Sequence, residues 1–222
     1  MNILEIPLHV TNPQRYDQVV VVHANDGVVE RAELRNNDRN LTEVVATAEE
    51  VTTAELVPAA PVRTNARTAA GVESHPALTS HPALTAPQRQ IVQAVRAWEA
   101  GDTVHGMAAI MEIDVPRFHH GFLADFEEAL RAVPAGTVVT YAQLAARLGN
   151  PRAFRAVAHA CATNRVPLFV PCHRVIPSKS AKQIRDGRPA DFGDYRYGRQ
   201  IKAAMIEHEA SVAGGLTLME DC

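Results

Sequence analysis

The chain has 222 residues, 46% of them hydrophobic, which is enough for the core of one large domain or of two small ones. Its three cysteines are too few for a disulfide scaffold, no Cys-x-x-Cys pair offers metal-ligand spacing, and no apolar run reaches the roughly 18 residues of a membrane span. The N-terminus also lacks the pattern of a secretory signal. We therefore expect a cytoplasmic protein with no metal site and no membrane contact.

The formal net charge of -3 conceals an uneven distribution. Residues 1–116 carry 8 basic and 15 acidic side chains, a net charge of -7, whereas residues 117–222 carry 14 and 10, a net charge of +4. Within residues 131–202 the counts are 13 and 3, a net charge of +10. This basic block favours a polyanion partner, because Lys and Arg on one surface release counterions from phosphates. A solvated basic face without a partner is the alternative, since clustering in sequence does not establish clustering in space.

The first part of the chain predicts a small antiparallel sheet with a covering helix. Strands are predicted at Asn2–His9 and Asp17–Ala24, and Asn25-Asp26-Gly27 predicts a hairpin turn into a third strand, Val28–Arg35. Apolar residues then recur at helical spacing over residues 41–51. This spacing predicts an amphipathic helix that covers one face of the sheet.

The segment 57–87 is rich in Ala, Pro and Thr and contains a tandem hexapeptide. Residues Ser74–Thr79 are repeated letter for letter as Ser80–Thr85, with a proline in each copy. Such a segment is typical of a linker or a surface excursion from the first domain. Pro87 then opens a predicted helix with three packing residues, Ile91, Val95 and Trp98.

A second unit is predicted to begin near residue 116. Its first helix has one apolar face and ends before the turn Pro134-Ala135-Gly136; the residues of that face are Phe122, Phe126, Leu130 and Val133. Thr140 and Gln143 then form a predicted capping box, which begins a short helix that Gly149 ends.

A second short helix follows at once, with Asn150 as its cap and Pro151 in its first position. Two short helices joined by a tight turn predict a helix-turn-helix, a motif common in DNA-binding proteins. Arg152 and Arg155 near the start of the second helix are candidate DNA-binding residues. Many helical hairpins share this pattern and bind nothing, so a purely structural role is the alternative.

The pentapeptide Pro171-Cys172-His173-Arg174-Val175 follows an apolar run and sets a cysteine next to a possible base. A thiolate is a strong nucleophile and a thiol is not, so a base near Cys172 would activate it. Neighbouring side chains of an extended segment point to opposite sides. We therefore predict that His173 does not touch the sulfur directly.

Together these motifs resemble the O6-alkylguanine-DNA alkyltransferases. The likeness runs from about Phe118 to Glu209 and rests on the segments Val139–Ala145, Asn150-Pro151, Arg155-Ala156-Val157, Asn164, Pro171–Val175, Tyr195–Gly198 and His208-Glu209. The resemblance implies an α/β (α+β) protein. A small N-terminal ribonuclease-H-like sheet-and-helix domain would span residues 1–116, and a mostly helical DNA-binding domain of winged-helix or helix-turn-helix type would span residues 117–222.

The resemblance implies direct reversal of DNA damage by a monomer that acts once and needs no cofactor. An alkyl group on O6 of guanine, or less readily on O4 of thymine, would move irreversibly from double-stranded DNA to Cys172. In the family a water relays the thiol proton to the counterpart of His173, which the counterpart of Glu209 orients. Tyr141 matches the tyrosine that protonates the leaving base, and Asn164 matches the residue that joins the recognition helix to the cysteine segment.

The resemblance also implies how DNA is bound. Guanine O6 is inaccessible inside a stacked duplex, so the base must rotate out into a pocket. Arg155 matches the arginine that fills the vacated stack while its helix, which also carries Arg152, lies in the minor groove. Pro167 and Tyr195 would contact the extruded base. Backbone groups would read its edge, namely those of Cys172, Val175 and Arg196.

The sequence also departs from the family pattern, and other classes of function remain open. Residues Ser178–Phe192 form a longer and more polar segment than the usual substrate loop. One alternative is a non-catalytic protein that binds alkylated DNA or regulates its repair, although relatives of that kind replace the nucleophile. A cysteine hydrolase is another, but it requires turnover and an oxyanion hole and leaves the helix-turn-helix unexplained.

Overall fold

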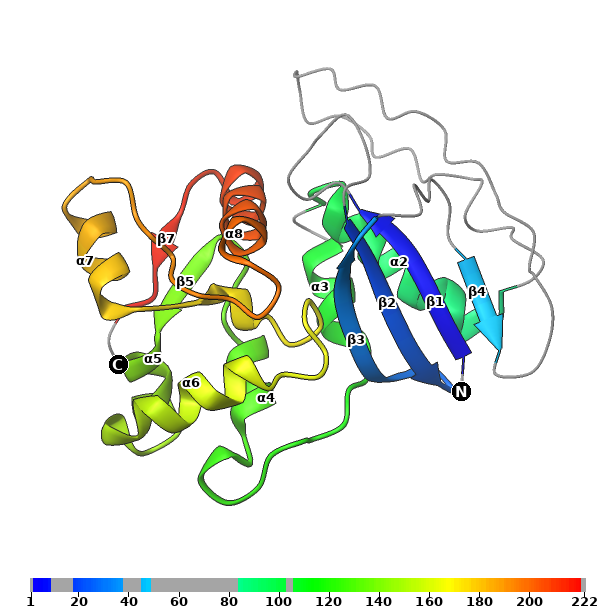
Figure 1. The fold of residues 1–222 in the computed structure, drawn as a ribbon, viewed down its shortest axis with the longest axis horizontal. Coiled ribbons are helices and arrows are strands. Elements are labelled where there is room, and N and C mark those ends of the chain that lie inside the picture. Colours follow the sequence, from blue (N-terminus) through cyan, green and yellow to red (C-terminus); the bar gives the residue numbers. More distant parts are fainter. Residues whose placement is uncertain (1, 9–17, 38–44, 49–83, 103–105, 221–222) are drawn as a thin grey trace.

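A computed structural model describes residues 2–8, 18–37, 45–48, 84–102 and 106–220 of the chain. It has a mixed α/β fold, with an antiparallel sheet and two helices from the N-terminal part beside a mainly helical C-terminal part (Figure 1). In the described residues, no helix is long and apolar enough to cross a lipid bilayer.

The N-terminal sheet has four strands in the order β3-β2-β1-β4, and each neighbouring pair is antiparallel. Asp26 and Gly27 form the turn between β2 and β3 with φ values of 46° and 87°, the left-handed conformation that tight hairpins require. This confirms the predicted hairpin. The strands are β1 (Asn2–Leu8), β2 (Gln18–Asn25), β3 (Val28–Asn36) and β4 (Val45–Ala48).

The predicted helix over residues 41–51 is wrong where the structure describes that segment. Residues Val45–Ala48 form β4, which pairs with the free edge of β1 from Asn2↔Ala48 to Glu5↔Val45. Two of its four residues are β-branched, and pairing with an open sheet edge outweighs a helical spacing of apolar residues. The rest of the predicted helix and residues 57–83 of the predicted excursion lie outside the described residues.

Helix α2 (Ala86–Glu99) confirms the prediction that a helix opens at Pro87. Thr85 caps its first turn reciprocally with Gln88, and Pro87 occupies the first turn, where a missing N–H costs little. The predicted packing residues Ile91, Val95 and Trp98 are all buried. Arg96 Nη1 donates to the carbonyl of Pro7, 2.6 Å away, which joins the helix to β1. Helix α3 (Gly106–Glu112) follows and packs beside α2.

The C-terminal part consists of short helices around a small sheet, in which β5 pairs in parallel with both β6 and β7. The helix predicted from Phe122 is divided at Asp125 into two elements, η1 and α4. The elements are η1 (Gly121–Leu123), α4 (Phe126–Arg131), β5 (Thr137–Thr140), α5 (Tyr141–Arg147), η2 (Pro151–Ala153), α6 (Phe154–Ala162), η3 (Cys172–Arg174), β6 (Val175–Ile176), α7 (Ser178–Arg185), α8 (Arg199–Ala213) and β7 (Thr217–Leu218).

The two predicted helices of the helix-turn-helix are present as α5 and α6. Thr140 and Gln143 form the predicted capping box, with bonds of 3.1 and 2.8 Å, and Gly149 follows α5 at φ 85°. Asn150 caps the next segment by accepting the amide of Arg152 at 3.2 Å. Pro151 opens the 3-10 turn η2 instead of an α-helix, so α6 itself begins three residues later.

Strand β3 also forms backbone hydrogen bonds with segments outside the N-terminal sheet. The amide of Ala32 donates to the carbonyl of Arg165 at 2.7 Å, and the amide of Val29 donates to the carbonyl of Asp114 at 2.8 Å. The first of these bonds supports the loop that follows α6. The edge of the N-terminal sheet thereby fixes the backbone next to Asn164.

Candidate active site

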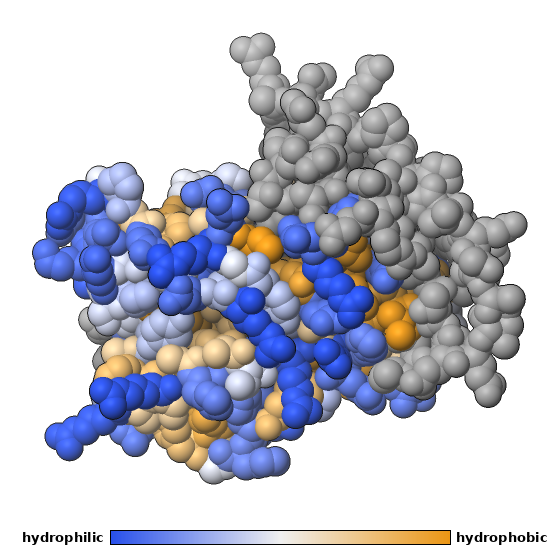
Figure 2. Space-filling view, in the orientation of Figure 1, coloured by the Kyte–Doolittle hydropathy of each residue, from blue (hydrophilic) through white to orange (hydrophobic). Residues whose placement is uncertain are grey.

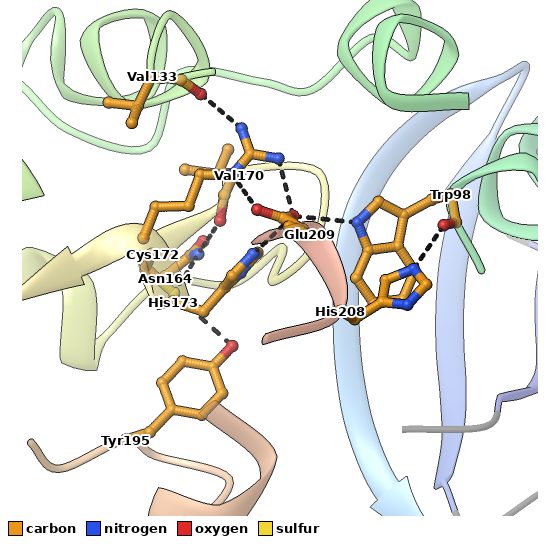
Figure 3. A network of polar contacts seen from close by, with 10 residues as sticks. Trp98, Val133, Asn164, Val170, Cys172, His173, Tyr195, His208 and Glu209 are labelled. Carbon is orange, nitrogen blue, oxygen red and sulfur yellow. Dashed lines mark hydrogen bonds and ion pairs between the residues drawn. The ribbon is translucent and has the colours of Figure 1, made fainter. Parts of the chain in front are cut away.

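A buried carboxylate, Glu209 of α8, lies at the centre of a polar network (Figure 3). Its side chain is 1% exposed. Oε1 accepts from His173 Nε2 at 2.9 Å, from Arg174 Nη2 at 2.9 Å and from Trp98 Nε1 at 3.0 Å. Oε2 accepts from Arg174 Nε at 2.8 Å. The carboxylate therefore joins α2, η3 and α8 at one point. The contact between Glu209 and His173 that the resemblance implies is present.

The ionisation of this network follows from its partners. The hydrogen bonds from His173 and Arg174, together with the positive charge of Arg174, hold the pKa of Glu209 well below its ordinary value despite its burial. Burial lowers the pKa of His173, with Glu209 opposing that effect. The imidazole is therefore neutral at pH 7, and its Nε2–H donates to the carboxylate. Nδ1 then carries the lone pair and has no hydrogen-bond partner among the described residues, so it can take a proton.

Cys172 begins the 3-10 turn η3 and is 3% exposed. The predicted extended segment is wrong here, since the carbonyl of Cys172 accepts a hydrogen bond from the amide of Val175 and closes a turn. The sulfur accepts a hydrogen bond from Nδ2 of Asn164 at 3.0 Å and lies 4.0 Å from the hydroxyl of Tyr195. Its contacts are thus with two groups that can stabilise a thiolate. No contact of the sulfur with His173 occurs among the described hydrogen bonds, in line with the prediction.

Asn164 connects α6 to the cysteine segment with all of its polar atoms. Besides the sulfur, Nδ2 donates to the carbonyl of Val170 at 2.7 Å, and Oδ1 accepts the amide of Val166 at 3.0 Å. The side chain is 6% exposed, so these bonds fix its orientation. Burial raises the pKa of the Cys172 thiol, and the bond from Asn164 is the first of the influences that lower it again.

Two tyrosines border the thiol. Burial raises the pKa of Tyr141, the first residue of α5, so its phenol keeps its proton at neutral pH. Burial also raises the pKa of Tyr195 well above its ordinary value. Tyr195 packs edge-on against Tyr197 with ring centroids 5.4 Å apart. Both hydroxyl groups therefore keep their protons at neutral pH, and that of Tyr195 lies 4.0 Å from the sulfur.

The other residues predicted to contact the extruded base differ in their exposure. Pro167 and Val175 are buried, whereas Arg196 is exposed. Leu168, next to Pro167, is buried with φ at 75°, a strained conformation for a residue with a side chain. The turn that contains both residues returns the chain from Asn164 to the cysteine.

The candidate DNA-binding arginines lie on the surface of η2 and α6. Arg152 and Arg155 are exposed, and the Arg155 guanidinium lies 5.9 Å from the ring centroid of Phe154, which is itself 45% exposed. Val157 and Ala160 are buried and hold α6 in the core. Figure 2 shows hydrophilic side chains beside hydrophobic ones over this end of the C-terminal part.

The basic block of the sequence is only partly a surface feature. Arg174 and Lys202 are buried, so they add nothing to an exposed positive face. The segment from Ser178, which the sequence analysis treated as a loop, begins with helix α7, whose Ala181 packs with Val138 and Ile206. A regular helix therefore occupies the first half of that long segment.

Three residues of the site were missed by sequence reasoning. Trp98 was predicted to pack, and it does, but its indole N–H also donates to Glu209. Arg174 neutralises that carboxylate, and Lys202 is buried in α8. A signal existed for Trp98 alone, because a buried indole N–H usually finds a hydrogen-bond partner. Among the described residues, no group of three or more His, Cys, Asp or Glu side chains is placed to hold a metal ion.

The site thus defines a protein with a buried, hydrogen-bonded thiol backed by a neutral histidine and a carboxylate. A family model described as the DNA-binding domain of 6-O-methylguanine DNA methyltransferase matches residues 122–211. This range includes Cys172, His173 and Glu209 but not Trp98. This part of the chain therefore resembles the O6-alkylguanine-DNA alkyltransferase family.

Individual relatives show the extent of the likeness. The human methylated-DNA–protein-cysteine methyltransferase is 36% identical over 117 residues, which are 50% of this chain and 52% of that protein. The Salmonella typhimurium protein of the same name is 42% identical over 88 residues, 40% of this chain and 46% of its own length. The Escherichia coli bifunctional transcriptional activator/DNA repair enzyme Ada is 42% identical over 83 residues, 37% and 21% of the two chains. The chain therefore spans between about a fifth and a half of these relatives.

The fold resembles solved structures over nearly the whole chain. A Mycobacterium tuberculosis O6-methylguanine methyltransferase superposes with a TM-score of 0.54 at 19% identity, covering 95% of this chain and 94% of that one. Mycobacterium tuberculosis OGT in complex with DNA superposes with a TM-score of 0.52 at 20% identity, covering 91% of each chain. These matches extend the likeness of fold to the N-terminal sheet.

Proposed function

We propose that the protein repairs DNA by direct reversal, with one irreversible transfer of an alkyl group from O6 of guanine, or less readily O4 of thymine, to Cys172. The observation that carries this proposal is the hydrogen bond from Asn164 to the buried sulfur, next to a neutral His173 that is paired with the carboxylate of Glu209. Alkyl transfer needs a soft nucleophile in a site shielded from bulk solvent, and the buried, hydrogen-bonded sulfur meets both needs.

The reaction begins with loss of the thiol proton. The lone pair on Nδ1 of His173 takes that proton, through a water as in the family, and Glu209 stabilises the imidazolium that results. The Cys172 sulfur then attacks the alkyl carbon, so a sulfur–carbon bond forms while the bond from that carbon to O6 breaks. The electron pair of the broken bond stays on the base, and the hydroxyl of Tyr141 supplies a proton to it. None of these reaction steps regenerates the thiol, so each protein molecule can accept one alkyl group.

The partner in this proposal is double-stranded DNA that contains O6-alkylguanine, bound by a monomer. Arg155 enters the stack from the exposed surface of α6, and Arg152 contacts phosphate. Pro167 and Tyr195 face the extruded base, whose edge meets backbone groups of Cys172, Val175 and Arg196. We also assign residues 1–116 to a ribonuclease-H-like domain and residues 117–222 to a domain of winged-helix or helix-turn-helix type.

Repair stoichiometry tests the proposal. The protein is mixed in excess and then in deficit with a duplex that carries one O6-methylguanine, and the restored guanine is counted by chromatography of the digested DNA. We expect one guanine restored per protein molecule and no further repair on longer incubation. Binding without any restored guanine would favour the non-catalytic alternative, and continued turnover would favour an enzyme of another class.

The exposed position of Arg155 leads to a second expectation. Arg155→Ala should slow repair of a paired O6-methylguanine about tenfold or more, because extrusion costs a few kcal/mol that the inserted side chain offsets. Reaction with the free base O6-benzylguanine, which needs no extrusion, should stay within about twofold of the wild-type rate. Rates are measured in single-turnover experiments with both substrates. Equal losses on both would assign Arg155 to the chemistry of the pocket instead.

A further inference from the structure

Lys202 of α8 is buried in a way that the mechanism above does not explain. Its side chain is 1% exposed and is among the largest that are fully buried. Nζ donates to the carbonyl of Asp194 over 3.5 Å and lies 5.9 Å from the ring centroid of Tyr141. No carboxylate oxygen of a described residue lies within the 4.0 Å of an ion pair. A buried ammonium with one long hydrogen bond and no anion is costly to fold around.

The ammonium faces groups that become anions only at a cost. The ring of Tyr141 from α5 lies beside it, and Cys172 from η3 and Cys161 from α6 lie within reach of its charge; burial raises the pKa of each of the three. The loop before α8 adds two exposed carboxylates, Asp191 and Asp194, which pair with Arg199, and the network behind Cys172 adds His173.

Lys202 keeps its charge at neutral pH. Burial lowers its pKa from 10.5 to about 8, and the negative charge of Cys161 and Cys172 as thiolates opposes that effect. In turn its charge lowers the pKa of the Cys172 thiol. The other buried cation of the site, Arg174, is engaged by Glu209 and by the carbonyl of Val133. Lys202 is thus the cation left available to the sulfur among the described buried residues.

We propose that Lys202 is a positioning residue that stabilises the thiolate of Cys172 by its charge and holds the ring of Tyr141 by a cation–π contact. The importance of this charge for repair rests on the function proposed above, whereas its effect on the thiol does not. A buried positive charge also favours the departing base, since negative charge grows on O6 as its bond to carbon breaks. A merely structural lysine would support the loop through Asp194 and leave the thiol unaffected.

Lys202→Met separates these two roles because it keeps the length of the side chain and removes the charge. Alkylation of Cys172 by iodoacetamide, followed by mass spectrometry of its peptide, is measured from pH 6 to pH 10 in wild type and variant. We expect the midpoint pH to rise by about one unit or more in the variant, which is at least a tenfold loss of thiolate at neutral pH. The melting temperature should stay the same or rise, since the substitution removes a buried unpaired charge.

Two further variants complete the test. Lys202→Arg keeps the charge and should retain most of the wild-type midpoint, and Lys179→Met, at an exposed lysine, should change nothing. If Lys202→Met does not fold, Lys202→Gln takes its place. A lower melting temperature with an unchanged midpoint in the neutral variant would overturn the proposal. Failure of the wild type to repair DNA would overturn the proposed function alone, because the alkylation midpoint requires no DNA.

Discussion

Glu209→Ala is expected to lower the free energy of unfolding by about 3–5 kcal/mol, the usual cost of removing one partner from a buried ion pair. The substitution leaves the guanidinium of Arg174 buried without its carboxylate and takes an acceptor from both His173 and Trp98. Urea denaturation at pH 7 measures the loss. Glu209→Gln keeps the volume but not the charge, so we expect it to fall between wild type and alanine.

The same carboxylate makes stability depend on pH in a defined direction. Because the pKa of Glu209 is lowered by folding from its ordinary value of 4.5, its contribution is fully present above about pH 4.5 and is lost as the pH falls below it. The difference in stability between wild type and Glu209→Ala should therefore shrink in acid. A difference below about 1 kcal/mol at pH 7 would contradict the role of this network in the fold.

His173→Gln is expected to slow alkyl transfer by about 10²–10⁴-fold, the range typical of a lost general base. Glutamine retains a donor for Glu209 but has no group that accepts a proton at neutral pH. Single-turnover repair of the methylated duplex measures the effect, and binding to unmodified duplex should be unchanged.

His119→Gln is the matched control for that experiment. His119 also pairs with a buried glutamate, since its Nδ1 lies 2.6 Å from Oε1 of Glu127 in α4. That pair has no contact with the Cys172 network among the described hydrogen bonds. We expect the control to repair DNA at nearly the wild-type rate. A similar loss in both variants would mean that His173 supports the fold and not the proton transfer.

Local signals predicted several of the elements that the structure contains. The β2–β3 hairpin depends on Asp26-Gly27, and the start of α5 depends on the capping box of Thr140 and Gln143, so both could be inferred from a few neighbouring residues. Strand β4 could not, because its conformation is set by the edge of β1, more than 35 residues earlier in the chain. The 3-10 turn at Cys172 was missed because no glycine or capping residue marks it.

Residues of the site that belong to a sequence motif could be predicted. Residues whose role depends on being buried next to the motif could not. The pairing of His173 with Glu209 followed from the family resemblance, and the structure confirms that contact. The roles of Trp98 and Lys202 depend on which side chains are buried next to each other in the fold. Trp98 is 111 residues from Glu209 in the chain, and Lys202 is 30 residues from Cys172. No periodicity or spacing in the sequence predicts those contacts. The same limit made the basic block seem more exposed than it is.

The most direct test of the account is the fate of the Cys172 sulfur. The protein is incubated with a duplex that carries one O6-methylguanine and is then digested for peptide mass spectrometry. We predict one methyl group on the peptide of Cys172, at no more than one per protein molecule, with none on the peptides of Cys161 or Cys222 and none in Cys172→Ser. Repaired DNA together with an unmodified Cys172 would contradict the account.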